Sequence, residues 1–185
     1  MKSKMRSIVL LAVNLISLNS LYSQTDRIQS VLADVSEKHS RGVYKSTIPD
    51  LKKILNLRPY HDRILIHYAI ALMYQENPIS EEEYIVDCRK ASELLLKVIH
   101  LNQANLKAGF TDQLALLYFY RGLSLWFSGQ PDQALHEFSL SIKYDPSLFQ
   151  AVFNQAVILM EMGRMQEFNM KIQEYEGLKL KQVKP

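Results

Sequence analysis

The chain has 185 residues, of which 48% are hydrophobic, and a formal net charge of +3. Only six glycines and six prolines accompany this apolar content, which excludes a low-complexity disordered chain and favours one domain with a packed core. The single cysteine, Cys88, excludes an internal disulfide, and we expect it to be a small buried side chain.

Residues 1–23 have the order of a secretory signal peptide. Lys2, Lys4 and Arg6 precede an apolar run over residues 8–13, which loosens through residue 18, and small and polar residues follow up to the expected cleavage site after Ser23. The run is shorter than the roughly 20 apolar residues of a membrane span. We therefore expect an exported, bacterial-type protein, periplasmic or extracellular, with no membrane span after cleavage. An uncleaved membrane anchor is the alternative.

The net charge belongs to this leader. No acidic residue precedes Asp26, so Lys2, Lys4 and Arg6 account for the whole excess of positive charge, and the remaining chain is formally neutral. A general electrostatic attraction to nucleic acid or to an anionic membrane is therefore unsupported.

From residue 24 onward the sequence predicts helices separated by short breaks, without the alternating β-branched pattern of strands. One helix start is clear at Ser80, where a hydroxyl cap is followed by Glu81, Glu82 and Glu83. The expected breaks lie at residues 40–42, 58–59, 77–78, 102–110, 129–131, 145–146 and 162–163.

The C-terminal half contains an internal repeat. Gly122 and Ala156 occupy equivalent places in two helices and are 34 residues apart, and Gly129 and Gly163 have the same offset in the turns that follow. Gly122 permits close approach of the next helix, Gly129 suits a left-handed helix end, and Pro131 suits the first turn of a helix.

These motifs resemble the tetratricopeptide repeat (TPR). The resemblance rests on an aromatic residue, a small residue, Ala-x-x-x-Phe and a closing proline, which here are Tyr118, Gly122, Ala134 to Phe138 and Pro146. Arg121 and Gln155 stand where the pattern has an apolar residue. The resemblance implies an all-α, right-handed α-solenoid of about four antiparallel helix pairs. It divides the chain into a signal peptide (1–23), a repeat domain (24–178) and a basic tail (179–185).

Within the repeat domain, the resemblance varies. Residues 111–146 match best, 147–178 form a final repeat, 60–103 have a lengthened connection, and 25–59 are degenerate. Much of the lengthened connection is expected to be extra helix before Ala91. Pro49 departs from the pattern and is expected to delay the start of its helix.

The sequence contains no constellation that predicts catalysis. The five histidines have no second histidine or cysteine at metal-ligand spacing, and there is no glycine-rich phosphate loop or nucleophile elbow. We expect no enzyme activity, no cofactor and no metal.

The resemblance implies instead that the first helix of each pair lines a concave groove for a protein or peptide partner. Carried onto this sequence, the groove residues are Ile66, Ile70, Met73, Leu116, Phe119, Leu123, Trp126, Phe153, Asn154, Val157 and Met160, with Gln150 and Arg63 at two further pattern positions. Most are apolar, which predicts an apolar or amphipathic ligand, with Trp126 as the candidate hot spot. A groove filled by the chain itself, through residues 102–110 or the tail, is the alternative.

The leading functional hypothesis is a non-enzymatic interaction module or assembly scaffold of the cell envelope. A structural subunit that self-assembles through its end helices, giving a homo-oligomer, is the second hypothesis. An unrecognised envelope hydrolase is the third.

Overall fold

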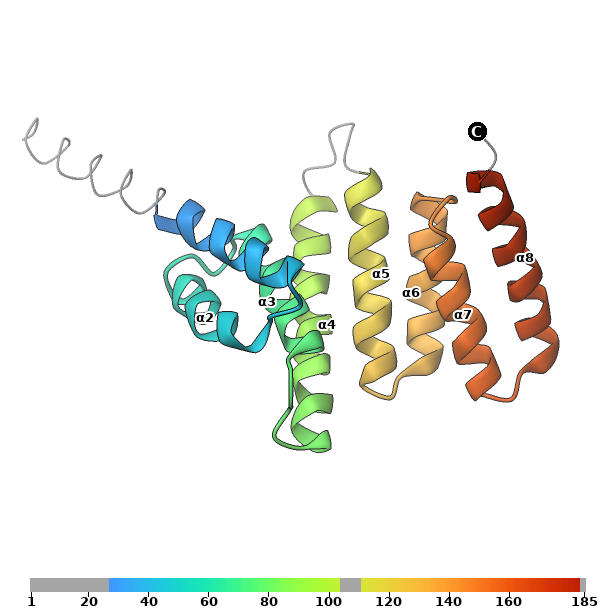
Figure 1. Cartoon of the computed structure of the whole chain (residues 1–185), viewed down its shortest axis with the longest axis horizontal. Coiled ribbons are helices and arrows are strands. Elements are labelled where there is room, and N and C mark those ends of the chain that lie inside the picture. Colours follow the sequence, from blue (N-terminus) through green and yellow to red (C-terminus); the bar gives the residue numbers. More distant parts are fainter. Residues whose placement is uncertain (1–26, 104–110, 184–185) are drawn as a thin grey trace, which may run out of the picture. The chain divides into compact units, whose positions relative to one another are not determined.

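The computed structural model describes residues 27–103 and 111–183 (Figure 1). The expected signal peptide and most of the 102–110 linker lie outside the described residues. The chain divides into two compact units, residues 1–42 and 43–185, and each is described by itself.

The described part of the first unit is one helix, residues 27–40. Two ion pairs between residues four apart lie along it, Lys38 with Asp34 at 2.8 Å and Arg41 with Glu37 at 2.6 Å. The helix is followed by Gly42 at a φ of 74°, a conformation that favours glycine and that ends the helix near the predicted break.

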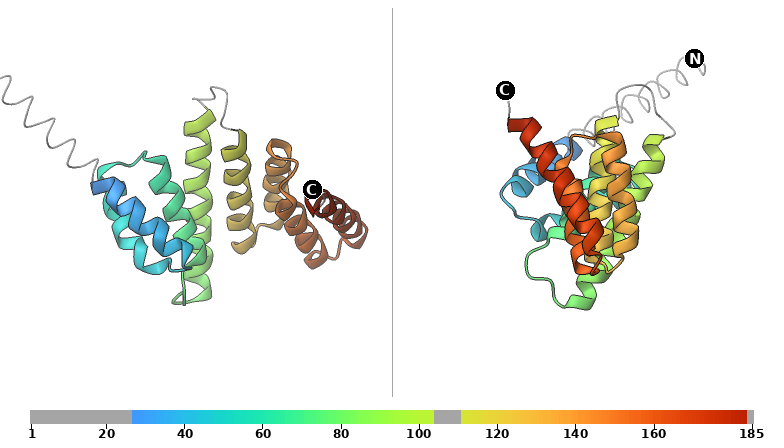
Figure 2. Two further views of the ribbon diagram at one scale, coloured as in Figure 1. Left: turned by 45° about the horizontal axis from the view of Figure 1, so that its top comes forward. Right: turned by 90° about the vertical axis from the view of Figure 1, so that its right-hand side faces the viewer.

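The described residues of the second unit form helices that are joined by short turns and loops. In chain order it contains η1 (Lys45–Thr47), α2 (Ile48–Leu57), α3 (Asp62–Tyr74), α4 (Glu81–Gln103), α5 (Thr111–Phe127), α6 (Pro131–Tyr144), α7 (Phe149–Glu161) and α8 (Met165–Val183). The predicted all-α solenoid is confirmed: α3/α4, α5/α6 and α7/α8 form antiparallel pairs that stand side by side (Figures 1 and 2).

The 34-residue repeat is present in the turns as well as in the helices. At the end of α5, Gly129 has a φ of 78° and the amide of Gln130 bonds to the Leu125 carbonyl at 2.9 Å. At the end of α7, Gly163 has a φ of 73° and the amide of Arg164 bonds to the Leu159 carbonyl, also at 2.9 Å. Both turns therefore close with the same Schellman hydrogen bond, which confirms the predicted role of the two glycines.

Gly122 controls how closely α5 and α6 approach. A Cβ atom at this position would lie 2.9 Å from the ring of Phe138, a separation that real Cβ atoms essentially never show. Phe138 is completely buried in the seam, and Tyr118 stacks on Tyr144 across the same pair at 5.5 Å. The aromatic and small residues of the repeat signature thus pack α5 directly onto α6.

The other helix boundaries follow from caps and prolines. The Ser80 hydroxyl accepts a hydrogen bond from the Glu83 amide at 3.1 Å, and α4 begins at Glu81, so the extra helix expected before Ala91 is present. Pro49 lies in the first turn of α2, where its missing N–H is tolerated, and η1 precedes it. At the C-terminal end, α8 continues to Val183, beyond the expected domain end at Leu178, with Lys181 beside the negative end of the helix dipole.

Two polar side chains replace apolar signature residues inside the stack. Arg121 in α5 forms an ion pair with Glu137 in α6, and both side chains are largely buried. Gln155 in α7 donates its amide to the Leu135 carbonyl at 3.1 Å and to the Ser139 hydroxyl at 2.8 Å. The seams are therefore packed through polar contacts where the repeat pattern has apolar ones.

Candidate protein-binding groove

A cavity of about 330 Å³ opens on the face formed by α3, α5, α7 and α8. We call it the aromatic groove. Five of its lining side chains are aromatic and none is charged. It is lined by Tyr74, Phe119, Leu123, Phe149, Gln150, Phe153, Asn154 and Tyr175.

Helical spacing brings these side chains to one face. In α5, Phe119 and Leu123 are four residues apart and therefore lie one above the other. In α7, Phe149 and Phe153 have the same spacing, and Gln150 and Asn154 follow one residue behind each. The first helices of two successive pairs thus provide the floor, while Tyr74 at the end of α3 and Tyr175 in α8 complete the lining.

The rings at the α7–α8 side form a cluster. The ring centre of Tyr175 is 5.2 Å from that of Phe153 and 5.8 Å from that of Phe149, both in tilted arrangements. Phe153 nevertheless exposes 42% of its surface, so packing within the cluster leaves much of this ring open. An exposed aromatic side chain in a concave apolar site is typical of a surface that a partner covers.

The opposite side contains a group of phenols. Tyr74 packs on Tyr44 at 5.5 Å and on Phe127 at 6.4 Å. Burial, together with the neighbouring Tyr120 and Tyr44, raises the pKa of Tyr74 to about 12. Like any tyrosine hydroxyl in the physiological pH range, that of Tyr74 is protonated and can donate a hydrogen bond.

The floor of the groove is uncharged because α5 and α7 carry almost no charge where they face it, whereas on α8 the Lys179 ammonium lies 5.7 Å from the centre of the Tyr175 ring. Residues 149–160 of α7 include no charged side chain, and the only one in residues 113–127 of α5 is Arg121, which pairs with Glu137. A charged group placed on this floor would be desolvated without a counter-ion from α5 or α7. The arrangement therefore suits uncharged ligand groups.

Four of the predicted groove residues line the cavity together, Phe119, Leu123, Phe153 and Asn154, and so does Gln150 at one of the two further pattern positions. The others lie outside the lining. Leu116 and Met160 are exposed at 48% and 47%, and Met73 is buried at 2%. Ile66, Ile70, Trp126 and Val157 are half-buried.

Three lining aromatics lie outside the predicted set: Tyr74, Phe149 and Tyr175. Tyr74 and Phe149 are each one residue away from a pattern position, at the end of α3 and the start of α7. Tyr175 is in a second helix, and the repeat pattern assigns groove residues to first helices. Phe168, Ile172 and Tyr175 recur at steps of four and three residues, and this spacing is the sequence signal for an inward-facing apolar stripe on α8 that includes Tyr175.

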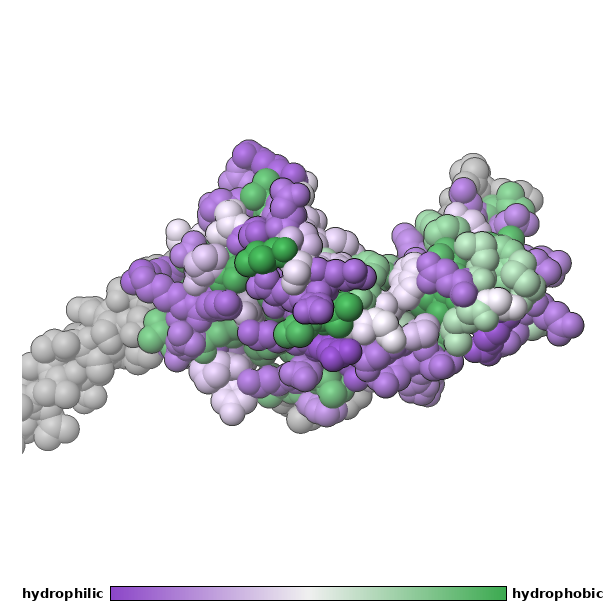
Figure 3. Space-filling view, turned by 90° about the horizontal axis from the view of Figure 1, so that it is seen from below, coloured by the Kyte–Doolittle hydropathy of each residue, from purple (hydrophilic) through white to green (hydrophobic). Residues whose placement is uncertain are grey.

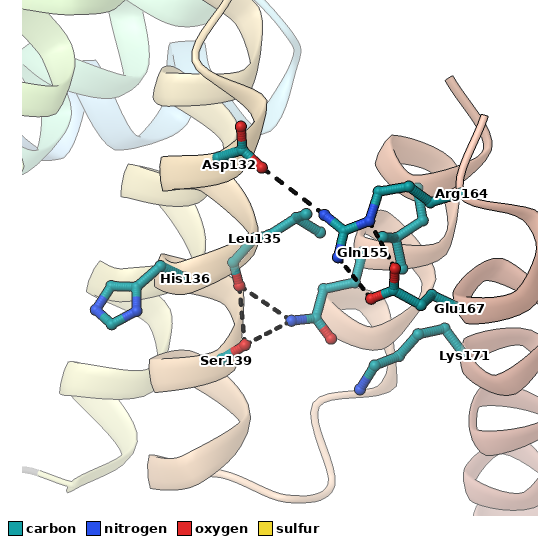
Figure 4. A pocket seen from close by; sticks show the side chains of 9 residues that line it. Asp132, Leu135, His136, Ser139, Gln155, Arg164, Glu167 and Lys171 are labelled. Atoms are coloured by element: carbon teal, nitrogen blue, oxygen red, sulfur yellow. Dashed lines mark hydrogen bonds and ion pairs between the residues drawn. The ribbon is translucent and has the colours of Figure 1, made fainter. Parts of the chain in front are cut away.

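A second cavity, of about 300 Å³, lies between α6, α7 and α8 (Figure 4). This polar pocket is lined by Asp132, Leu135, His136, Ser139, Gln155, Leu159, Arg164, Glu167 and Lys171. Its charges are largely paired: Arg164 bonds twice to Glu167, at 2.7 and 2.6 Å, and approaches Asp132 at 3.7 Å. Lys171 pairs with Glu174 at 2.8 Å, so each Asp, Glu, Lys and Arg side chain that lines the pocket has an ion partner.

The described residues contain neither a metal-binding cluster nor a membrane-spanning helix. Across residues 27–103 and 111–183, no three His, Cys, Asp or Glu side chains are grouped so that they could hold a metal ion. None of the helices in these ranges is long and apolar enough to cross a membrane. Cys88 is buried, as expected, and burial raises the pKa of its thiol to about 11.

Comparison with known proteins gives a structural likeness and no sequence family. No protein-family profile matches the chain, and no curated protein matches its sequence. Among solved structures, the chain is similar to a double mutant of MamA from strain RS-1, with a TM-score of 0.66 and 15% identity over 85% of this chain and 78% of that one. It is also similar to MamA residues 41 to the end from Desulfovibrio magneticus RS-1, with a TM-score of 0.62 and 15% identity over 84% and 76%. At this identity the likeness supports the helical-repeat fold alone.

Proposed function

We propose that this protein is a non-enzymatic interaction module of the cell envelope that binds an apolar or amphipathic segment of a partner protein in the aromatic groove. The observation that carries the proposal is the groove itself: a neutral cavity of about 330 Å³ lined mainly by aromatic side chains from four helices. The TPR-like stack supplies such a face because the first helices of successive pairs stand next to each other.

The energetics favour a protein ligand. Tyr74 and Phe153 expose 37% and 42% of their surfaces inside the groove. Covering an exposed aromatic side chain contributes on the order of 2 kcal/mol, and a few such anchors provide most of the affinity of a typical interface. The amide side chains of Gln150 and Asn154 add uncharged hydrogen-bonding groups that can pair with a peptide backbone.

The cellular location is part of the proposal and is supported by the sequence alone. The cationic, then apolar, then small-residue order of residues 1–23 predicts export, and the partner is then another protein of the envelope or the exterior. The near-absence of charge in the groove fits a segment of that partner that is poorly soluble when uncovered.

The test compares partner capture by three forms of the protein in an envelope extract: wild type, Phe153→Ala in the groove, and His136→Ala in the polar pocket. We expect a partner that wild type and His136→Ala retain to equal extents and that Phe153→Ala loses by at least tenfold. Phe153→Ala retaining every partner of the wild type would contradict the proposal.

Self-assembly is a second candidate, favoured by the last helix. Met165, Met170 and Leu180 of α8 are exposed at 50%, 61% and 64%, and Figure 3 shows apolar surface on the side where α7 and α8 lie. Light scattering across a hundredfold range of protein concentration tests it. A mass that rises with concentration in wild type and not in Met170→Lys supports assembly through α8, and a constant monomer mass contradicts it.

A further inference from the structure

We propose that the ligand of the aromatic groove is an extended, uncharged, proline-rich segment in the polyproline II conformation. This inference rests on the proposed function and names the class of its ligand. Three features of the groove carry it: its rings, its lack of charge and the kind of polar atoms that it offers.

The first feature is the aromatic lining. Phe149, Phe153 and Tyr175 form one cluster, with centroid distances of 5.2 and 5.8 Å, and Tyr74 and Phe119 lie in the same cavity. Grooves lined by aromatic rings recognise polyproline II segments because the pyrrolidine ring packs flat against an aromatic face. A polyproline II segment is also already extended and stiff, so its binding costs less conformational entropy than ordering a flexible chain.

The second feature is the neutrality of the groove. Residues 149–160 of α7 carry no charge, and the charge of Arg121 in α5 is directed away into its buried pair with Glu137. A chain terminus or a segment rich in lysine, aspartate or glutamate would lose hydration on the floor of the groove and find no ion partner on α5 or α7. Proline-rich segments meet this restriction because they contain rings in place of charges.

The third feature is the supply of hydrogen-bond donors. In polyproline II the backbone carbonyls have no internal partner, and proline has no N–H, so the segment needs donors and offers few. The polar side chains of the groove, Tyr74, Tyr175, Gln150 and Asn154, can all donate. An amphipathic helix has already paired its own backbone groups and would leave these donors without a use.

The probe is a capped decaproline peptide, acetylated at one end and amidated at the other, titrated into the purified protein by calorimetry. Two peptides of equal length serve as controls: a capped leucine-rich amphipathic helix and a capped Gly-Ser chain. We expect saturable binding of decaproline to wild type, with an affinity at least tenfold above that of both controls.

Substitutions then test whether decaproline binds in the groove, and they distinguish the contribution of the aromatic rings from that of the tyrosine hydroxyls. We expect Tyr74→Phe and Tyr175→Phe, which keep the ring, to weaken binding by about three- to tenfold, the range for the loss of one hydrogen bond. Phe153→Ala should weaken it at least tenfold, and His136→Ala should leave it unchanged. The exposure of Phe153 lets the fold persist, which a thermal melt of each variant checks.

Three results would overturn the inference. The first is decaproline binding to wild type that does not saturate. The second is decaproline binding that is unchanged in Phe153→Ala. In the third, the amphipathic helix binds wild type more tightly than decaproline does, and it loses affinity in Phe153→Ala. The proposed function then stands, and the polyproline inference fails. If no apolar or proline-rich peptide binds at all, both fail together.

Discussion

The indole nitrogen of Trp126 in α5 donates a hydrogen bond of 2.9 Å to the carboxylate of Glu161 in α7. Trp126 also stacks on Phe127, with ring centres 5.8 Å apart. The residue that the sequence pattern selects as a groove hot spot therefore joins the first helices of two successive pairs. Its hydrogen bond links the two helices that form the floor of the aromatic groove.

This bond predicts a matched set of stability changes. Trp126→Phe keeps a ring and loses the donor, and Glu161→Ala loses the acceptor; we expect each to lower the free energy of unfolding by about 0.5–1.5 kcal/mol. Glu161→Gln keeps an acceptor oxygen and should remain within about 0.5 kcal/mol of wild type. Urea unfolding followed by circular dichroism measures all three, and equal values for Glu161→Ala and Glu161→Gln would contradict a role for the bond.

The close approach of α5 and α6 predicts opposite outcomes at two helical glycines. Gly122→Ala places a Cβ 2.9 Å from the Phe138 ring and should destabilise the protein by about 1–3 kcal/mol. At Gly177 in α8 a Cβ meets nothing within 4 Å, so Gly177→Ala should stabilise by about 0.5–1 kcal/mol through its better helix propensity. Thermal melts of both variants decide, and a neutral Gly122→Ala would show that the seam can relax.

Because Arg121 and Glu137 form a largely buried ion pair, we expect the effects of their substitution on the free energy of unfolding to be strongly coupled. Removing one partner, as in Glu137→Leu, leaves a largely buried charge unpaired and should cost about 3–5 kcal/mol. The double variant Arg121→Met with Glu137→Leu removes both charges and should be more stable than Glu137→Leu alone. A double-mutant cycle in urea tests this, and additive single-variant effects would show that the pair is not coupled.

The hydrogen bonds between the Glu76 carboxylate and the start of η1 predict an acid-dependent change near the groove. The Glu76 carboxylate accepts hydrogen bonds from the amides of Tyr44 and Lys45, at 2.8 and 2.9 Å, and the bond from Lys45 is the main cause of its lowered pKa. Because the folded pKa is below the ordinary 4.5, the anchor is complete above that pH and is lost as the pH falls through the lowered value.

Amide chemical shifts of Tyr44 and Lys45 measure this titration. We expect both to shift together at a midpoint below pH 4.5 in wild type. Glu76→Gln, which cannot ionise, should remove the midpoint and serves as the control. Shifts that persist unchanged in Glu76→Gln would show that another group controls η1.

Sequence reasoning succeeds where local chemistry decides the outcome. Gly129 and Gly163 specify helix ends by themselves, and Ser80 specifies a helix start, so the boundaries and the 34-residue period are readable without a structure. The close approach at Gly122 involves Phe138, sixteen residues away in the chain, and could be predicted because the repeat signature contains both positions.

The groove is harder to predict from the sequence because its lining residues come from four helices. The repeat pattern places Phe119 and Phe153 together, since both are at equivalent positions of first helices. It gives no reason to add Tyr175, which joins them only because α8 packs against α7 and turns this ring toward Phe153. Nor does it show that Arg121 is neutralised by Glu137, which is sixteen residues away in the chain.

The central claim, that a partner protein occupies the aromatic groove, is tested most directly by site-specific photo-crosslinking in living cells. Benzoylphenylalanine is placed at Phe153 in the groove and, in a matched control, at His136 in the polar pocket. We expect a discrete crosslinked protein from position 153 and none from position 136, with the crosslink in an uncharged segment of the partner. Crosslinks from position 136 alone, or from neither position, would contradict the account.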